Sequence, residues 1–184
     1  MRIISGTHRG RKLHSPRGKT IRPTTDRVRE AIFNILGPLN GYCAVLDLFS
    51  GTGALALEAL SRGVDSALLI DHDPAALAIS RKNIRTLAMD SRTRLLRWNI
   101  ARNLKCLYKS PVAFDLVFMD PPYDRGLVTH TLGDLPSTGA LAPGARLVVE
   151  HSAREIPDIT GLPYHRVDKR RYGKVLVAFF TFML

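Results

Sequence analysis

The chain has 184 residues, 45% of them apolar and 23% charged, which is typical of one globular domain and excludes a disordered, collagen-like or coiled-coil protein. Lys and Arg total 27 against 16 Asp and Glu, so the formal net charge is +11. A balance this basic favours a polyanionic partner, nucleic acid first, because each cation bound to a phosphate releases condensed counterions. The alternative is a surface that is merely highly charged.

The N-terminal segment carries most of this charge. Residues 1–30 contain 9 Lys and Arg but only 2 Asp and Glu, and so hold +7 of the net charge. Interspersed Gly and Pro predict a basic hairpin extension over 1–23, ahead of one compact domain over 24–184. The candidates for contact with a polyanion are Arg9, Arg11, Lys12, Arg22 and Arg27.

Residues 24–36 have the apolar spacing of a helix that Thr24 or Thr25 caps and that Gly37 and Pro38 end. Arg27 and Arg29 lie off its apolar stripe, so both are expected to extend the positive surface.

From residue 44 onward, short apolar runs alternate with helical patterns. Strands are predicted over 44–49, 66–71, 93–98, 114–119 and 145–150, helices over 53–63, 73–88 and 127–135, and two final strands that turn at Gly173. This alternation predicts an α/β fold with a Rossmann-like, seven-stranded, mostly parallel sheet whose last strand is antiparallel.

Other features exclude several classes of protein. Cys43 and Cys106 form no CxxC pair and have no neighbouring His, so we expect no metal, a reducing cytoplasm, and two small core residues. The longest apolar stretch, at 175–184, is far shorter than the roughly 20 residues that span a bilayer, and residues 1–10 lack the apolar run of a signal peptide. Membrane insertion and secretion are therefore not expected.

The first strand runs into a glycine turn, "LDLFSGTGALALEAL". Gly51 and Gly53 would let the backbone approach a ligand, and Asp71 lies 20 residues after Gly51, where an acid commonly binds ribose hydroxyls. This pattern leaves NAD and S-adenosylmethionine both open. Asp47 favours the second, because a carboxylate suits an ammonium or sulfonium better than a pyrophosphate. A helix-capping or turn role is the alternative for Asp47 and Asp71.

Two further residues belong to the predicted cofactor site. Ser50 stands in the glycine turn, and Asn99, just past the third strand, could accept a hydrogen bond from an adenine amine or could be a plain turn residue. The predicted cofactor ligands are Asp47, Ser50, Gly51, Gly53, Asp71 and Asn99.

The fourth strand ends in Asp120, Pro121, Pro122 and Tyr123. In an open α/β sheet this end lies at the ligand crevice, beside the glycine turn. There, the Asp120 carboxylate and the Pro121 carbonyl could each accept a hydrogen bond from one N–H group of an exocyclic base amine. This pair of hydrogen bonds would direct the lone pair of the amine at a methyl donor. Tyr123 offers a flat face for an unstacked base. The alternative is a turn that only ends the strand.

Five segments carry a family resemblance over nearly the whole chain. In chain order they are "MRIISGTHRGRKL", "RPTTDRVREAIFNIL", "LDLFSGTGALALEALSRG", "FDLVFMDPPY" and "RRYGKVLV". Together they resemble the RsmD family of bacterial 16S rRNA guanine-N2 methyltransferases. The resemblance implies a class I methyltransferase that uses S-adenosylmethionine and acts on small-subunit rRNA in an assembled or assembling particle. We also expect the protein to be a monomer.

The resemblance also implies roles for individual residues. Asp47, Gly51 and Gly53 match the first cofactor motif, Asp71 the ribose acid, and Asp120 to Tyr123 the catalytic motif. Asp71 stands where many relatives have Glu, and Asn99 where Asp is usual. The basic N-terminus resembles an RNA-binding extension, to which Arg170, Arg171 and Tyr172 add unless they form a solvated turn.

Three other functions stay open. A DNA adenine or protein glutamine methylase could use a similar acidic or amide motif followed by Pro, Pro and an aromatic residue. A non-catalytic RNA-binding assembly factor would retain the basic surface, and a nicotinamide dehydrogenase would require a substrate domain for which the sequence gives no sign.

Overall fold

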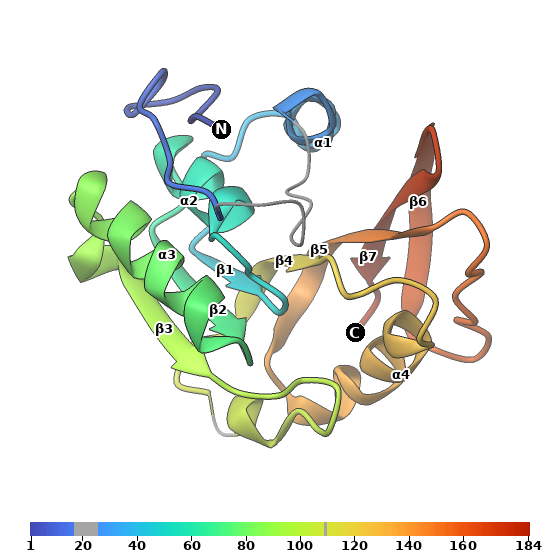
Figure 1. Cartoon of the computed structure of the whole chain (residues 1–184). Coiled ribbons are helices and arrows are strands. Elements are labelled where there is room, and N and C mark those ends of the chain that lie inside the picture. The colour runs from blue at the N-terminus through green and yellow to red at the C-terminus, as the bar shows by residue number, and fades with distance from the viewer. Residues whose placement is uncertain (17–25, 109) are drawn as a thin grey trace.

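The computed structural model describes residues 1–16, 26–108 and 110–184. Its centre is one sheet of seven strands in the order β3-β2-β1-β4-β5-β7-β6 (Figure 1). The strands are β1 (Ala44–Asp47), β2 (Ser66–Asp71), β3 (Thr93–Arg97), β4 (Phe114–Met119), β5 (Leu141–Ser152), β6 (Tyr164–Tyr172) and β7 (Val175–Phe182). Strands β1 to β5 pair in parallel, and β7 pairs antiparallel with both β5 and β6. The predicted fold class is confirmed.

In the described part of the chain, four α-helices cover the sheet: α1 (Asp26–Leu36), α2 (Ala54–Ser61), α3 (Pro74–Thr86) and α4 (Leu127–Asp134). Three short 3₁₀ helices span Asp90–Arg92, Lys105–Leu107 and Pro136–Thr138. In Figure 1, α1, α2 and α3 lie on the opposite side of the sheet from α4. This two-sided cover explains why the central strands read as nearly unbroken apolar runs.

Alternate residues of these strands enter two separate cores. Val45 and Phe118 pack with the residues of α1 and α2, while Leu46 and Val117 pack with those of α4. Because successive side chains point to opposite faces of a strand, each run supplies both layers.

The element boundaries differ slightly from those predicted. The strand predicted over 44–49 ends at Asp47, although the amides of Leu48 and Ser50 still donate to the carbonyls of Phe118 and Ile70, at 3.1 and 2.9 Å. β5 begins four residues earlier than predicted and ends two later. Asp73 caps α3 as predicted, because its side chain accepts a hydrogen bond from the amide of Ala75 at 2.9 Å.

The N-terminal segment is fastened to α2. Arg2 and Lys12 form an antiparallel bridge, in agreement with the predicted hairpin, and the rest of the predicted extension, 17–23, lies outside the described residues. The carboxylate of Glu58, on α2, is fully buried and accepts hydrogen bonds from the amides of Ile4 and Ser5 at 2.7 and 2.9 Å. A buried carboxylate with these partners holds residues 1–16 against the domain.

Two sequence predictions were wrong. Arg29 does not extend the positive surface: it is fully buried, donates to the carbonyl of Arg2 and lies 3.1 Å from the Asp26 carboxylate. Burial lowers the pKa of its guanidinium. Cys43 is exposed and not a core residue, while Cys106 is partly buried.

Among the described residues, no helix has the length and apolar character needed to cross a membrane, and no group of three or more His, Cys, Asp or Glu could hold a metal ion.

Candidate functional site

A cavity of about 690 Å³ runs along the carboxyl ends of the strands. Strand order reverses between β1 and β4, the point at which an open α/β sheet forms its ligand crevice. Residues from both sides of this point line the cavity, among them Asp47, Ser50, Gly51, Asp71 and the tetrapeptide Asp120 to Tyr123. The fold therefore brings the glycine turn and the tetrapeptide into one cavity.

Hydrogen bonds fix the glycine turn in place. The two carboxylate oxygens of Asp71 accept from the amides of Gly51 and Asp73, at 2.8 and 2.9 Å. From α3, Ser80 donates to the carbonyl of Gly51 at 2.8 Å and Asn83 to that of Thr52 at 2.9 Å. The turn is thus held rigidly before any ligand binds.

Gly51 and Gly53 both have a positive φ, but their surroundings differ. Gly51 has a φ of 53° and lines the cavity, and a Cβ there would meet nothing within 4 Å. Gly53 has a φ of 77°, and its Cβ would lie 2.7 Å from the side chain of Leu69. Of these two glycines, Gly51 lines the cavity and Gly53 does not, so a close approach to a ligand stays a prediction for Gly51 alone. At Gly53 the missing Cβ instead leaves room for Leu69 of β2.

Asp47 is a buried acid beside a second acid. It is 2% exposed, and burial, with a smaller contribution from the Asp71 charge, raises its pKa to about 7. Backbone N–H groups of Phe49 and Ala56 donate to its carboxylate and oppose this shift. These two hydrogen bonds fit the turn-stabilising role that was the alternative for Asp47. They do not offset the cost of burying its negative charge, because the pKa is still raised. A cationic ligand in the cavity would stabilise this charge.

The residues present fit S-adenosylmethionine. The hydroxyl of Ser50 is buried in the cavity wall and has no hydrogen-bond partner in the part of the chain that the structure describes. Such a group requires a partner, which a ligand can supply. The Asp47 carboxylate would suit the positive charge of the methionine moiety, and Asp71, at the end of β2, lines the same cavity and would be a candidate for the ribose hydroxyls.

Asn99 does not line the main cavity. It lines a neighbouring hollow of about 140 Å³ together with Trp98, and Phe49, Asp71 and Pro122 line both spaces. Its amide oxygen accepts from the amide of Ala101 at 3.1 Å, as expected of the turn residue predicted as its alternative.

Sequence reasoning missed Glu150, which lies two residues before the end of β5. Met119 pairs with Val149, so Glu150 lies beside Asp120 along the cavity edge. Glu150 is 6% exposed, and its carboxylate accepts a hydrogen bond from the hydroxyl of Tyr123. The sequence does show an acid, Glu150, at the end of the apolar run "RLVVE". Its proximity to Tyr123, however, follows only from the register of β4 with β5.

The predicted RNA-binding residues lie on different parts of the molecule. Arg9, Arg11 and Lys12 are exposed on the N-terminal segment, where Arg11 donates to the carbonyl of Thr86 at 2.8 Å. Arg27, on α1, is exposed and lines the main cavity. Arg22 lies outside the described residues.

The reversed strand β7 and the carboxylate-lined cavity at the switch point define a Rossmann-like class I methyltransferase, and S-adenosylmethionine is its cofactor. The solved structure of yhhF from Escherichia coli superposes on the chain with a TM-score of 0.86 and 35% identity, covering 100% of this chain and 98% of that one.

Sequence similarity to known proteins then identifies the family to which the chain belongs. The family model described as Conserved hypothetical protein 95 matches residues 1–181. Ribosomal RNA small subunit methyltransferase D of Escherichia coli is 43% identical over 150 residues, covering 82% of this chain and 74% of the relative. YlbH of Bacillus subtilis is 35% identical over 181 residues, or 98% of each chain. The chain belongs to this family, which confirms the resemblance to the RsmD family.

Proposed function

We propose that the protein transfers the methyl group of S-adenosylmethionine to the exocyclic N2 amine of a guanine in 16S rRNA. The observation that carries the proposal is that Asp120 and Pro121 line the same cavity as Asp47 and the glycine turn. The name of the relative from Escherichia coli supports a small-subunit rRNA substrate.

The cofactor contacts follow from the residues of the cavity. Asp47 would hold the positive charge of the methionine moiety, Ser50 its carboxylate, and Asp71 the ribose hydroxyls, with Gly51 giving the backbone room. Asn99 would reach the adenine only from the neighbouring hollow. When bound, S-adenosylmethionine supplies a methyl group on a sulfonium, which is a good leaving group.

The chain's own contribution is to make the amine nucleophilic. The lone pair of an exocyclic amine is delocalised into the base, so the amine must become pyramidal before it can attack. The Asp120 carboxylate and the Pro121 carbonyl would accept hydrogen bonds from its two N–H groups and stabilise the positive charge that develops on nitrogen as the N–CH3 bond forms and the S–CH3 bond breaks. The methylated amine would then lose one proton, for which the Asp120 carboxylate is the neighbouring acceptor. Proline fixes φ at Pro121 and Pro122 and so limits the movement of that carbonyl.

Tyr123 would supply the stacking surface for the base. Its hydroxyl is held by the buried Glu150 carboxylate, so the ring does not have to be ordered when the substrate arrives. Guanine is the base in the proposal because the resemblance to the RsmD family implies it, since the exocyclic amine of adenine or cytosine could meet the same two acceptors.

The remaining parts concern the partner. Residues 1–23 would act as an RNA-binding extension of the domain at 24–184, with Arg9, Arg11, Lys12 and Arg27 in contact with phosphates, and Arg22 joining them from outside the described residues. The proposal further describes a cytoplasmic monomer that acts on the small subunit or on an assembly intermediate.

The test is methyl transfer from labelled S-adenosylmethionine to small ribosomal subunits from cells that lack the activity. We expect Asp120→Ala to lower kcat by roughly 100-fold or more, the usual cost of removing one group that stabilises transition-state charge. The affinity for the cofactor should change little by calorimetry. Asp134→Ala, which removes an exposed acid of α4, is the matched control. An unchanged rate in Asp120→Ala would remove the proposed mechanism.

Two outcomes would favour other functions. Transfer to DNA or to protein but not to rRNA would make the protein another amino-group methylase. Absence of any calorimetric affinity for S-adenosylmethionine would favour a non-catalytic assembly factor.

A further inference from the structure

The cavity continues well past the catalytic tetrapeptide. Beyond Glu150 it is lined by Arg171 and Tyr172 at the end of β6, Gly173 in the turn, and Val175 at the start of β7, which together are called the β6–β7 turn below. Because β6 lies three strands from β4, at about 4.8 Å per strand, the cavity reaches roughly 14 Å beyond the tetrapeptide. A site that held only the cofactor would not require it.

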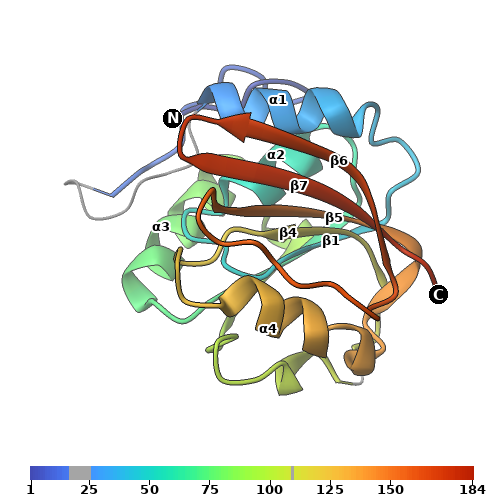
Figure 2. The same cartoon turned by 90° about the vertical axis from the view of Figure 1, so that its right-hand side faces the viewer.

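Strand pairing puts this turn at the same edge of the sheet as the tetrapeptide. Val175 pairs with Ser152 on one side and with Tyr172 on the other. Helix α1 contributes Arg27 and Val28 to the same cavity. In the view of Figure 2, the β6–β7 hairpin runs beneath α1. The far half of the cavity thus has a floor from the sheet edge and a wall from α1.

The two halves of the cavity differ in charge. The half next to β2 and β1 contains Asp47, Asp71 and Asp73, which suits a cationic cofactor. The far half contains Arg171, and Arg27 lines the cavity from α1, so two cations are available to bind an anion. A nucleotide bound with its base toward Asp120 would direct its phosphates to these arginines.

Tyr172 and Arg171 are both placed where a ligand in the cavity could contact them. Tyr172 is partly buried and packs on the same core as Tyr123. Arg171 is exposed and its Nε donates to the carbonyl of Gly173 at 3.0 Å, which anchors the guanidinium at the cavity. Its neighbour Arg170 instead forms two hydrogen bonds to Asp168, at 3.0 and 3.1 Å.

A simpler role explains only part of this arrangement. β6 is an edge strand, and exposed cations such as Arg166 and Lys169 discourage edge-to-edge pairing with other sheets. That role does not require an aromatic ring and an arginine to line the cavity.

We propose that the β6–β7 turn is the second wall of the target-nucleotide site. Tyr172 stacks on the unpaired target guanosine or on its neighbour, and Arg171 and Arg27 bind the flanking phosphates. The inference rests on the proposed function, because it assigns the far half of the cavity to the RNA substrate.

The experiment compares Tyr172→Leu with Tyr172→Phe. Leu keeps an apolar side chain against the core but removes the flat ring, whereas Phe retains the ring. We expect kcat/KM for the small subunit to fall by about 5- to 150-fold in the Leu variant and to stay within about twofold of wild type in the Phe variant. The dissociation constant for S-adenosylmethionine should not change in either variant.

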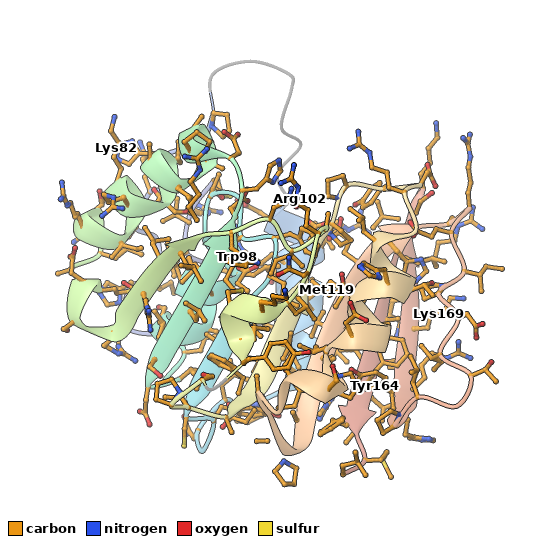
Figure 3. The ribbon with its side chains drawn as sticks, turned by 90° about the horizontal axis from the view of Figure 1, so that it is seen from below. Lys82, Trp98, Arg102, Met119, Tyr164 and Lys169 are labelled. Carbon is orange, nitrogen blue, oxygen red and sulfur yellow. The ribbon has the colours of Figure 1, made fainter. Side chains whose placement is uncertain are left out.

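A second comparison tests the phosphate contact. Arg171→Ala should reduce the slope of log affinity against log salt for a single-stranded RNA oligonucleotide by about 0.7, the contribution of one phosphate contact. Lys169→Ala is the charge-matched control, since Lys169 lies on the same edge strand (Figure 3) but is not among the residues that line the cavity. Equal slopes in the two variants, or equal losses in Tyr172→Leu and Tyr172→Phe, would overturn the inference.

The outcomes separate this inference from the proposed function. If the wild type methylates rRNA and the Leu and Phe variants behave alike, the inference fails and the function stands. If the wild type methylates no rRNA but Tyr172→Leu alone weakens oligonucleotide binding by fluorescence anisotropy, the function fails and the nucleotide wall stands.

Discussion

Replacing Asp47 with Asn should make the protein without cofactor more stable and its cofactor binding weaker. The carboxylate is buried and its pKa is raised from 3.8 to about 7. At about 1.36 kcal/mol per pKa unit, a rise of this size puts an upper limit of about 4 kcal/mol on the cost of the ionised form. Asn removes the charge while its amide oxygen can still accept a backbone N–H. We therefore expect Asp47→Asn to raise the free energy of unfolding at pH 8 by about 1–4 kcal/mol.

The raised pKa of Asp47 also predicts how the stability of the wild type changes with pH. Below pH 3.8 Asp47 is protonated in both the folded and the unfolded chain, so its charge costs nothing. Between 3.8 and about 7 the unfolded chain loses the proton while the folded one keeps it, so the wild type loses stability as the pH rises. The stability difference between variant and wild type should thus grow from pH 4 to 7 and level off above pH 7.

The assay is urea denaturation from pH 4 to 8, with and without S-adenosylmethionine. The variant should lose about 10- to 150-fold in cofactor affinity, the value of one hydrogen bond to a charged group. Asp65→Asn, which removes an exposed acid, is the control and should alter neither quantity. A variant that is less stable than wild type at pH 8, by an amount that does not vary with pH, would refute the reasoning.

Two further substitutions test how the cavity and the N-terminal segment are held. Gly53→Ala puts a Cβ 2.7 Å from Leu69 at a φ of 77°, and thermal denaturation should show a loss of about 1–3 kcal/mol. Gly51→Ala, whose Cβ meets open space, should lose less stability and more cofactor affinity. Glu58→Gln removes one of the two carboxylates beside the buried Arg29, and Asp26 remains, so the free energy of unfolding in urea should fall by about 1.5–3 kcal/mol. Limited proteolysis should then cut residues 1–16 faster, and unchanged cleavage would contradict the clamping role of Glu58.

Local patterns in the sequence were sufficient to predict the architecture. Apolar runs such as "FDLVFM" enter two cores through alternate side chains, so their strand character is visible without any partner. The strand-helix alternation then implies a parallel sheet, and the reversal of strand order brings Asp47 and Asp120 into one cavity.

Features that depend on distant partners could not be predicted. Arg29 lies off the apolar stripe of its helix, yet it is buried because the N-terminal segment packs over it. Glu150 reaches Tyr123 only through the register of β4 with β5. Likewise, the contact between Gly53 and Leu69 depends on how α2 packs on β2.

The most direct measurement of the central claim is nucleoside mass spectrometry of 16S rRNA. Small subunits from cells that lack the activity are incubated with the purified protein and S-adenosylmethionine, and the modified nucleotide is mapped. The account predicts one new N2-methylguanosine, which is absent with Asp120→Ala. A methyl group on adenine, on a ring nitrogen or on a ribosomal protein would contradict it.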